Sequence, residues 1–293
     1  MRSGSHFVID AFACTHVGRV RKGNEDSFFI ANLTERILRE TSGNLRFPSG
    51  AHGTLLAVAD GMGGAAAGET ASRLGVQTIY AKVQEMIARS RAGDGEDLEA
   101  IVSEAVGSAN SRIYDLGSRN SELEGMGTTL TLAFELQGRA LIGQIGDSRA
   151  YLIRADGIRQ LTRDQSLTGH KVDMGELTEE EARHDPERNI LLQALGVRPT
   201  VQLVMRWITL SPSDVLLLCS DGLHSQLSSS EIHRILLEAG DLESAGLDLV
   251  DLANRRGGPD NITAVLAQFL PARASDYDDT GDEQPSTLFD WRR

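Results

Sequence analysis

The chain has 293 residues, of which 40% are hydrophobic and 24% charged, as is typical of a globular protein with a sizeable core. Its formal net charge of -13 argues against binding to nucleic acid or to anionic membrane surfaces. No apolar run reaches the length of a membrane span and no signal peptide is evident, so we expect a soluble cytoplasmic protein. The two cysteines, Cys14 and Cys219, lie in apolar runs, which indicates buried thiols.

The N-terminal half begins with two short extended runs between His6 and Ile30. Residues Ala31 to Gly53 lack a clean period, and we expect a surface excursion between two strands there. The apolar run Leu55 to Ala59 predicts a strand buried on both faces. Apolar residues at helical spacing then predict two helices, marked by Val76 to Ile87 and by Leu98 to Leu116.

After these helices the period becomes strand-like, and close spacing of the apolar runs predicts antiparallel hairpins. The four hairpin strands are expected at Thr129–Leu136, Arg139–Ile145, Arg149–Arg154 and Ile158–Leu161. Residues 163–189 are polar and read as a small flap, in which Thr178 and Glu181 form a capping box for one short helix. The last predicted elements are strands at Val201–Ile208, Asp214–Cys219 and Ile262–Leu270, with helices at Ser230–Ala239 and Ser244–Arg255.

This order of elements favours an α+β fold in which two antiparallel sheets pack together with helices outside. We expect one domain over residues 1–270. Residues 271–293 are rich in Asp and poor in apolar residues, which predicts a disordered acidic tail.

Asp60 stands where the predicted buried strand ends, and three of the next four residues are glycine. Backbone without side chains beside a carboxylate is suited to hold a cation or a phosphate. Asp-Gly is also a common hairpin signal, as at Asp156-Gly157, but a helix and not a return strand follows Asp60. For this stretch alone, a plain turn and a functional site both remain open.

Further acidic residues also lie at the ends of apolar strands. They are Asp26 with Glu25 before Phe28–Ile30, Asp147 at a hairpin, Asp221 after Val215–Ser220, and Asp260 before Ile262–Val265. If these side chains meet at one edge, they must be neutralised, because charges beside an apolar core repel one another. Carboxylates without His or Cys suit Mg²⁺ or Mn²⁺ and not zinc. The alternative is that each carboxylate only caps a turn or a helix.

Seven motifs carry a resemblance to a known family: RVRKGNEDSF, VADGMGG, MGTTLTLA, GDSRAY, NILLQALG, SDGL and GGPDNIT, in this order. In this combination the chain resembles the bacterial branch of the metal-dependent protein phosphatase 2C family, from about Cys14 to Phe269. The resemblance implies a four-layer α-β-β-α sandwich. It also implies a serine/threonine phosphatase that hydrolyses phosphoserine and phosphothreonine.

The family resemblance further implies a centre of two Mg²⁺ or Mn²⁺ ions per chain, with a weaker third ion. By motif position, Asp60 would bridge both ions. The Gly61 carbonyl and Asp26 would bind one ion, and Asp221 and Asp260 would bind the other. Asp147 and Asp221 would bind the third ion, and Glu25 would act through water. The ions would lower the pKa of a bridging water, and the resulting hydroxide would attack phosphorus in line.

Arg21 matches the arginine that grips the substrate phosphate, although its basic neighbours Arg19 and Lys22 would otherwise indicate a solvated surface. His184 resembles a flap histidine linked to substrate handling, with an ordinary exposed histidine as the alternative. Two positions depart from the pattern. Met62 stands where many eukaryotic relatives carry a histidine that protonates the leaving group, and Ser225 stands where some relatives carry an acidic residue.

The partners implied by the resemblance are phosphorylated proteins, among them a serine/threonine kinase and its substrates, and a monomer is expected. Two other enzyme classes match locally. Gly61, Gly63 and Ala66 fit a dinucleotide-binding turn, with Glu85 at a suitable distance, but hairpins follow instead of parallel units. Gly146 to Ala150 nearly fits a hydrolase elbow, but a strand follows where that elbow needs a helix. A phosphoprotein-binding pseudophosphatase is the non-enzyme alternative.

Overall fold

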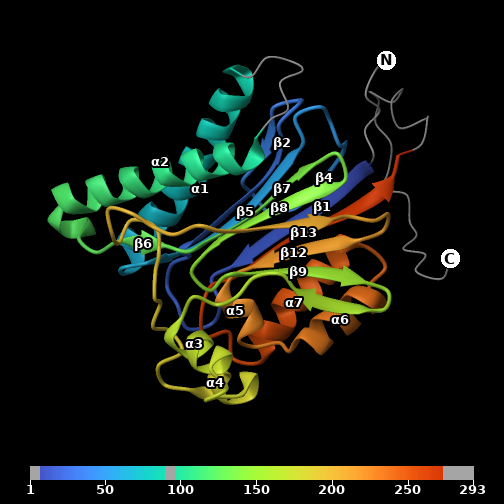
Figure 1. Ribbon diagram of the computed structural model, residues 1–293. Coiled ribbons are helices and arrows are strands. Elements are labelled where there is room, and N and C mark those ends of the chain that lie inside the picture. The colour runs from blue at the N-terminus through green and yellow to red at the C-terminus, as the bar shows by residue number, and fades with distance from the viewer. Residues whose placement is uncertain (1–6, 90–96, 273–293) are drawn as a thin grey trace.

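A computed structural model describes residues 7–89 and 97–272 of the chain. Two antiparallel sheets pack face to face, and helices cover both outer faces, so that the layers run α-β-β-α (Figure 1). The α+β sandwich predicted from the sequence is therefore confirmed. The predicted acidic tail lies, from residue 273 onward, outside the described residues.

The first sheet has the strand order β11-β8-β7-β5-β2-β3, with the two-residue strand β6 paired to β5. Its strands are β2 (Asp26–Asn32), β3 (Ile37–Arg39), β5 (Thr54–Met62), β6 (Gly127–Thr128), β7 (Leu130–Leu136), β8 (Arg139–Ile145) and β11 (Val204–Thr209). The second sheet has the order β10-β9-β12-β13-β1-β4. Its strands are β1 (Phe7–His16), β4 (Gly43–Pro48), β9 (Arg149–Arg154), β10 (Gly157–Gln160), β12 (Val215–Cys219) and β13 (Ile262–Pro271).

Two long helices, α1 (Ala65–Arg89) and α2 (Leu98–Arg119), cover the outer face of the first sheet (Figure 1). On the outer face of the second sheet lie α5 (Asp221–His224), α6 (Ser229–Glu238) and α7 (Leu242–Arg255). The short helices α3 (Leu167–Asp173) and α4 (Glu179–His184) lie together at one end of the sandwich (Figure 1). A single 3-10 turn, Ser121–Leu123, follows α2.

Three apolar layers hold the sandwich together: one between the sheets and one beneath each helical layer. Strands in the middle of each sheet are therefore covered on both faces, which explains why they read as continuous apolar runs and not as alternating ones. In β12, for example, all five residues are buried. Cys14 and Cys219 are both buried free thiols, as predicted.

Within residues 31–53, expected to form a surface excursion, the structure places two strands, β3 and β4. Strand β3 pairs with β2 at the edge of the first sheet, and β4 pairs with β1 at the edge of the second. Edge strands have one neighbour and partly exposed faces, so their apolar content is low and no clear period marks them in the sequence.

The flap predicted at residues 163–189 contains two helices where one was expected. The capping box at Thr178 and Glu181 is confirmed at the start of α4. The second helix, α3, begins after Ser166, whose hydroxyl accepts a hydrogen bond from the Gly169 amide. Among the described residues, no helix has the length and apolar character needed to cross a membrane.

Candidate active site

The centre of the site is the pairing of β2 with β5, in which Asp26 lies directly opposite Asp60. The chain leaves β5 through Gly63 and Gly64, which have φ values of 113° and 93° and so occupy the region that favours glycine. Gly61 is needed for a different reason, since a Cβ atom there would lie 2.1 Å from the carbonyl oxygen of Gly68. The sharp turn into α1 therefore leaves the Asp60 carboxylate beside bare backbone.

Three more aspartates reach the same end of the sandwich, from the second sheet and from the turn that connects the two sheets. Asp221 is the first residue of α5, directly after β12, and Asp260 lies in the loop before β13. These two strands are antiparallel neighbours, so the end of one lies beside the start of the other. Asp147 lies in the turn between β8 and β9. The sequence predicted a hairpin there, which is wrong, because β8 and β9 belong to different sheets and the turn crosses from one sheet to the other.

The charges of these side chains act on one another. The pKa of Asp60 is raised well above its ordinary value of 3.8, first by burial and then by the negative charges of Asp26, Asp221, Asp147 and Asp260. The structure thus brings together the five aspartates that the sequence singled out. Separate turn or helix caps would not influence one another in this way.

Asp26 and Asp221 respond to the same surroundings. Burial, the largest effect, raises the pKa of Asp26 to about 7, although hydrogen bonds from Thr263 and Ser220 lower it. Burial raises the pKa of Asp221 to about 6, aided by the charge of Asp260 and opposed by a hydrogen bond with Asp60. These carboxylates therefore take up protons unless another positive charge neutralises them.

Two buried carboxylate oxygens have no hydrogen-bond partner: Oδ1 of Asp26 and Oδ1 of Asp221. Buried polar atoms are nearly always paired, so unpartnered oxygens on two neighbouring carboxylates favour a cation as their missing partner. In the described ranges, however, no group of three or more His, Cys, Asp or Glu side chains is arranged so that it could hold a metal ion as it stands.

Arg21 lies at the rim of the cluster. Its Nη2 is 2.7 Å from Oδ2 of Asp260, and its Nη1 is 3.8 Å from Oε1 of Glu25. The side chain remains 46% exposed, so part of the guanidinium faces the solvent at the mouth of the site. The Glu25 carboxylate is buried, which raises its pKa, while the Arg21 charge lowers it.

Hydroxyl and amide side chains that the sequence analysis did not single out support the carboxylates. Ser220 Oγ and Thr263 Oγ1 both donate to Oδ2 of Asp26, over 2.7 Å and 2.6 Å. The Glu25 amide donates to Oδ1 of Asn261 over 2.7 Å. Ser220 lies in the motif SDGL, and Asn261 and Thr263 lie in GGPDNIT. Their positions beside Asp221 and Asp260 in the sequence could therefore have indicated a role in the site.

A second missed group lies behind Asp147. Arg149 forms a two-pronged ion pair with Asp164, with distances of 2.8 Å and 2.6 Å, and both side chains are largely buried. The His224 Nε2 lies 3.1 Å from the Asp147 carbonyl oxygen. Burial lowers the pKa of His224 to about 3, so the ring is neutral and donates from Nε2. These residues tie the Asp147 turn to α5 and to the start of the flap.

A cavity of about 630 Å³ separates the carboxylates from the flap. Asp147, Asp221 and Asp260 line one side, while flap residues His184 and Arg188 line the other. The His184 side chain is 78% exposed and lies 3.5 Å from Glu180, so it stands at the rim of this cleft. The Arg188 charge lowers the pKa of Asp221, which shows that the flap faces the site.

Comparison with known proteins agrees with this arrangement. The family described as Protein phosphatase 2C matches residues 44–270. The serine/threonine phosphatase stp of Listeria innocua is 35% identical over 254 residues, which cover 87% of this chain and 93% of that protein. The crystal structure of the Mycobacterium tuberculosis serine/threonine phosphatase PstP/Ppp has 35% identity and a TM-score of 0.74, covering 90% of this chain and 100% of that one. A structure of the PstP catalytic domain in complex with 2 manganese ions has 34% identity and a TM-score of 0.72, covering 90% of this chain and 99% of that one.

Proposed function

The chain belongs to the protein phosphatase 2C family of metal-dependent serine/threonine phosphatases, and we propose that its aspartate cluster holds two Mg²⁺ or Mn²⁺ ions during phosphoester hydrolysis. The observation that carries the proposal is the pair of unpartnered buried oxygens, Oδ1 of Asp26 and Oδ1 of Asp221, among carboxylates that raise one another's pKa. An all-oxygen donor set of this kind suits hard divalent cations.

The proposed ligands are those that match the family motifs. Asp60 would bridge both ions, the Gly61 carbonyl and Asp26 would serve one, and Asp221 and Asp260 would serve the other. Asp147 and Asp221 would share a weaker third ion, with Glu25 acting through water. Because no group of ligands is ready-made among the described residues, we propose that these carboxylates shift when the ions bind.

When bound, the ions would lower the pKa of a water between them and neutralise the phosphoryl oxygens. Side chains of the protein would bind the substrate and position the ligands. Arg21 offers the free side of its guanidinium to two phosphate oxygens at once. Ser220 and Thr263 donate to Asp26, which holds that carboxylate in place and favours its ionised form. Met62 cannot donate a proton, and in its place we propose water as the acid for the leaving group.

We propose phosphorylated proteins as substrates, namely a bacterial serine/threonine kinase and its targets, with residues 163–189 acting as a flap and His184 touching the bound protein. The names of the bacterial relatives support this substrate class. The test is a kinase autophosphorylated on Ser and Thr, which the phosphatase and Mn²⁺ should dephosphorylate. A phosphotyrosine peptide should be turned over at least about tenfold more slowly. Equal rates on both substrates would contradict the specificity.

The catalytic assignment is tested with Asp221→Asn. Removing this carboxylate should lower Mn²⁺-dependent hydrolysis of p-nitrophenyl phosphate by about 100-fold or more, because each metal ligand contributes to transition-state charge neutralisation. Asp156→Asn is the matched control, since Asp156 lies in the exposed turn between β9 and β10 and does not line the cleft. Full activity of Asp221→Asn would refute the assignment. Absence of turnover in the wild type would instead support a pseudophosphatase.

A further inference from the structure

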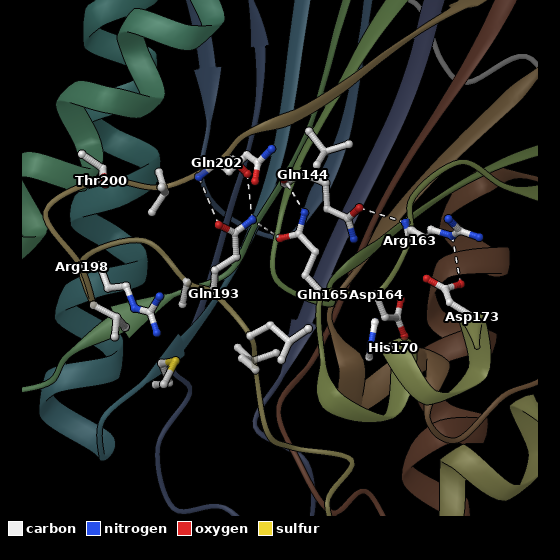
Figure 2. A pocket seen from close by; sticks show the side chains of 17 residues that line it. Gln144, Arg163, Asp164, Gln165, His170, Asp173, Gln193, Arg198, Thr200 and Gln202 are labelled. Atoms are coloured by element: carbon white, nitrogen blue, oxygen red, sulfur yellow. Dashed lines mark hydrogen bonds and ion pairs between the residues drawn. The ribbon is translucent and has the colours of Figure 1, made fainter. Parts of the chain in front are cut away.

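A second groove, of about 740 Å³, lies beside the proposed metal site and has no role in the chemistry described above (Figure 2). Four of its lining residues are large apolar side chains that remain exposed: Met62 at 36%, Leu192 at 48%, Val197 at 42% and Val204 at 48%. We call this the flanking groove. Exposed apolar residues that gather along one hollow indicate a binding surface, whereas scattered ones carry no such meaning.

The flanking groove is continuous with the catalytic cleft. Met62 stands two residues beyond Asp60 in β5, which places it roughly 7 Å along the strand from the proposed bridging ligand. Arg163, Asp164 and Asp173 line both cavities. A polypeptide whose phosphorylated residue enters the cleft can therefore reach the flanking groove with a residue a few positions away.

The floor of the groove is held by hydrogen bonds (Figure 2). Gln193 Nε2 donates to Oε1 of Gln165 and to the Gln202 carbonyl oxygen, each over 2.8 Å, and the Gln202 amide donates to Oε1 of Gln193. Gln165 Oε1 also accepts from the Gly146 amide over 2.8 Å, next to Asp147. A hollow fixed in this way is preformed, and little ordering opposes binding in it.

The charges at the junction of the two cavities are already paired within the chain. Arg163 lies 3.0 Å from Asp173, and Asp164 is held by Arg149. These paired charges offer little attraction to a charged side chain at the junction. Arg198 also lines the groove (Figure 2), but the exposed Leu192 and Val204 supply the surface that an apolar side chain can cover.

We infer that the flanking groove binds a large apolar side chain of the substrate protein, two to four residues from the phosphorylated serine or threonine. This rests on the proposed phosphatase function and adds a preference among its substrates. A Leu, Ile, Met or Phe at that position would cover the exposed faces of Leu192 and Val204. Removal of this apolar surface from water would lower KM for the phosphopeptide.

The test compares phosphothreonine peptides that differ only by Leu or Asn at each position from two to four residues on either side. The wild type should prefer Leu at one or more of these positions by about fivefold in kcat/KM, through KM. Leu192→Asn and Val204→Thr should each reduce that preference. Leu247→Asn is the matched control, because Leu247 is 51% exposed on α7, away from the groove, and it should keep the preference.

Hydrolysis of p-nitrophenyl phosphate separates this inference from the proposed function. That substrate is too small to reach the groove, so all three variants should turn it over within about twofold of the wild type. If the wild type hydrolyses both substrates but shows no preference for Leu in the peptides, the inference is overturned and the proposed function stands. A preference for Leu that survives in Leu192→Asn would also overturn the inference. Light scattering provides a further check. If the wild type is an oligomer and Leu192→Asn is a monomer, the inference is overturned, because a second copy of the chain would then cover the groove.

Discussion

Asp26 and Asp60 face each other directly across the antiparallel pair β2–β5. Like charges at facing positions destabilise a sheet, and here both carboxylates lie against the core of the sandwich. Burial is the largest cause of the raised pKa of each group, and the negative charges of neighbouring aspartates add to it. The fold thus keeps two carboxylates where only protons or cations make them stable, and this relationship leads to the first prediction.

Without metal, the stability of the chain should fall as pH rises from about 4 to 7. The unfolded chain releases its aspartate protons near the ordinary pKa of 3.8, whereas folded Asp221 and Asp26 hold theirs to about 6 and 7. The stabilising contribution of the protonated forms is therefore complete below pH 4 and is lost as pH passes through the folded values. Mn²⁺ bound at the proposed site would replace these protons, so its stabilising effect should grow with pH.

Thermal unfolding in EDTA and in Mn²⁺, at pH 5.5 and 7.5, measures this effect. We expect Mn²⁺ to raise Tm by about 5 °C more at pH 7.5 than at pH 5.5, which corresponds to roughly 2 kcal/mol for a chain of this length. Asp221→Asn removes one of the coupled charges, so in EDTA its Tm should depend less on pH than that of the wild type. An equal Mn²⁺ effect at both pH values would contradict the prediction.

Arg21→Ala should raise KM about tenfold or more for both p-nitrophenyl phosphate and phosphopeptides. In its proposed role the guanidinium would grip the phosphate that the two substrates share, and its loss would also leave Asp260 without its 2.7 Å partner. Arg21→Lys should recover only part of the loss, because an ammonium lacks the planar fork. Lys22→Ala, at the next position along the same basic run, is the control and should behave as the wild type. Steady-state kinetics at saturating Mn²⁺ provides the measurement.

Gly68→Ala should displace the Glu25 side chain and so disturb the aspartate cluster. A Cβ atom at Gly68 would lie 1.9 Å from Oε2 of the buried Glu25 and 3.0 Å from the backbone carbon of Gly61. The Glu25 carboxylate must then move, and we expect about a tenfold loss of Mn²⁺-dependent kcat/KM and a loss of stability of about 1–3 kcal/mol.

The matched control is Gly107→Ala, in the middle of α2, where nothing lies within 4 Å of the added methyl group. Since alanine favours a helix over glycine, this variant should gain about 0.5–1 kcal/mol and keep its activity. Urea denaturation and initial rates on the two variants measure both effects. If Gly68→Ala matched Gly107→Ala in both measurements, Glu25 would have no part in the site.

The sequence by itself determined the fold class and most of the elements. Buried strands such as Val215–Cys219 read as continuous apolar runs, and the capping box at Thr178 and Glu181 fixed the start of α4. These signals are local, because hydrophobic period and cap chemistry act over a few residues. The acidic residues at strand ends were visible for the same reason.

Only the tertiary structure decided which of these residues meet. Asp26 and Asp260 are more than 200 positions apart, and their shared rim depends on the order of strands in two sheets. The edge strand β4, the Arg149–Asp164 ion pair and the flanking groove all depend on partners distant in sequence. Long-range packing carries no period along the chain, and for that reason the sequence predicted the ligands of a site but not the surface beside it.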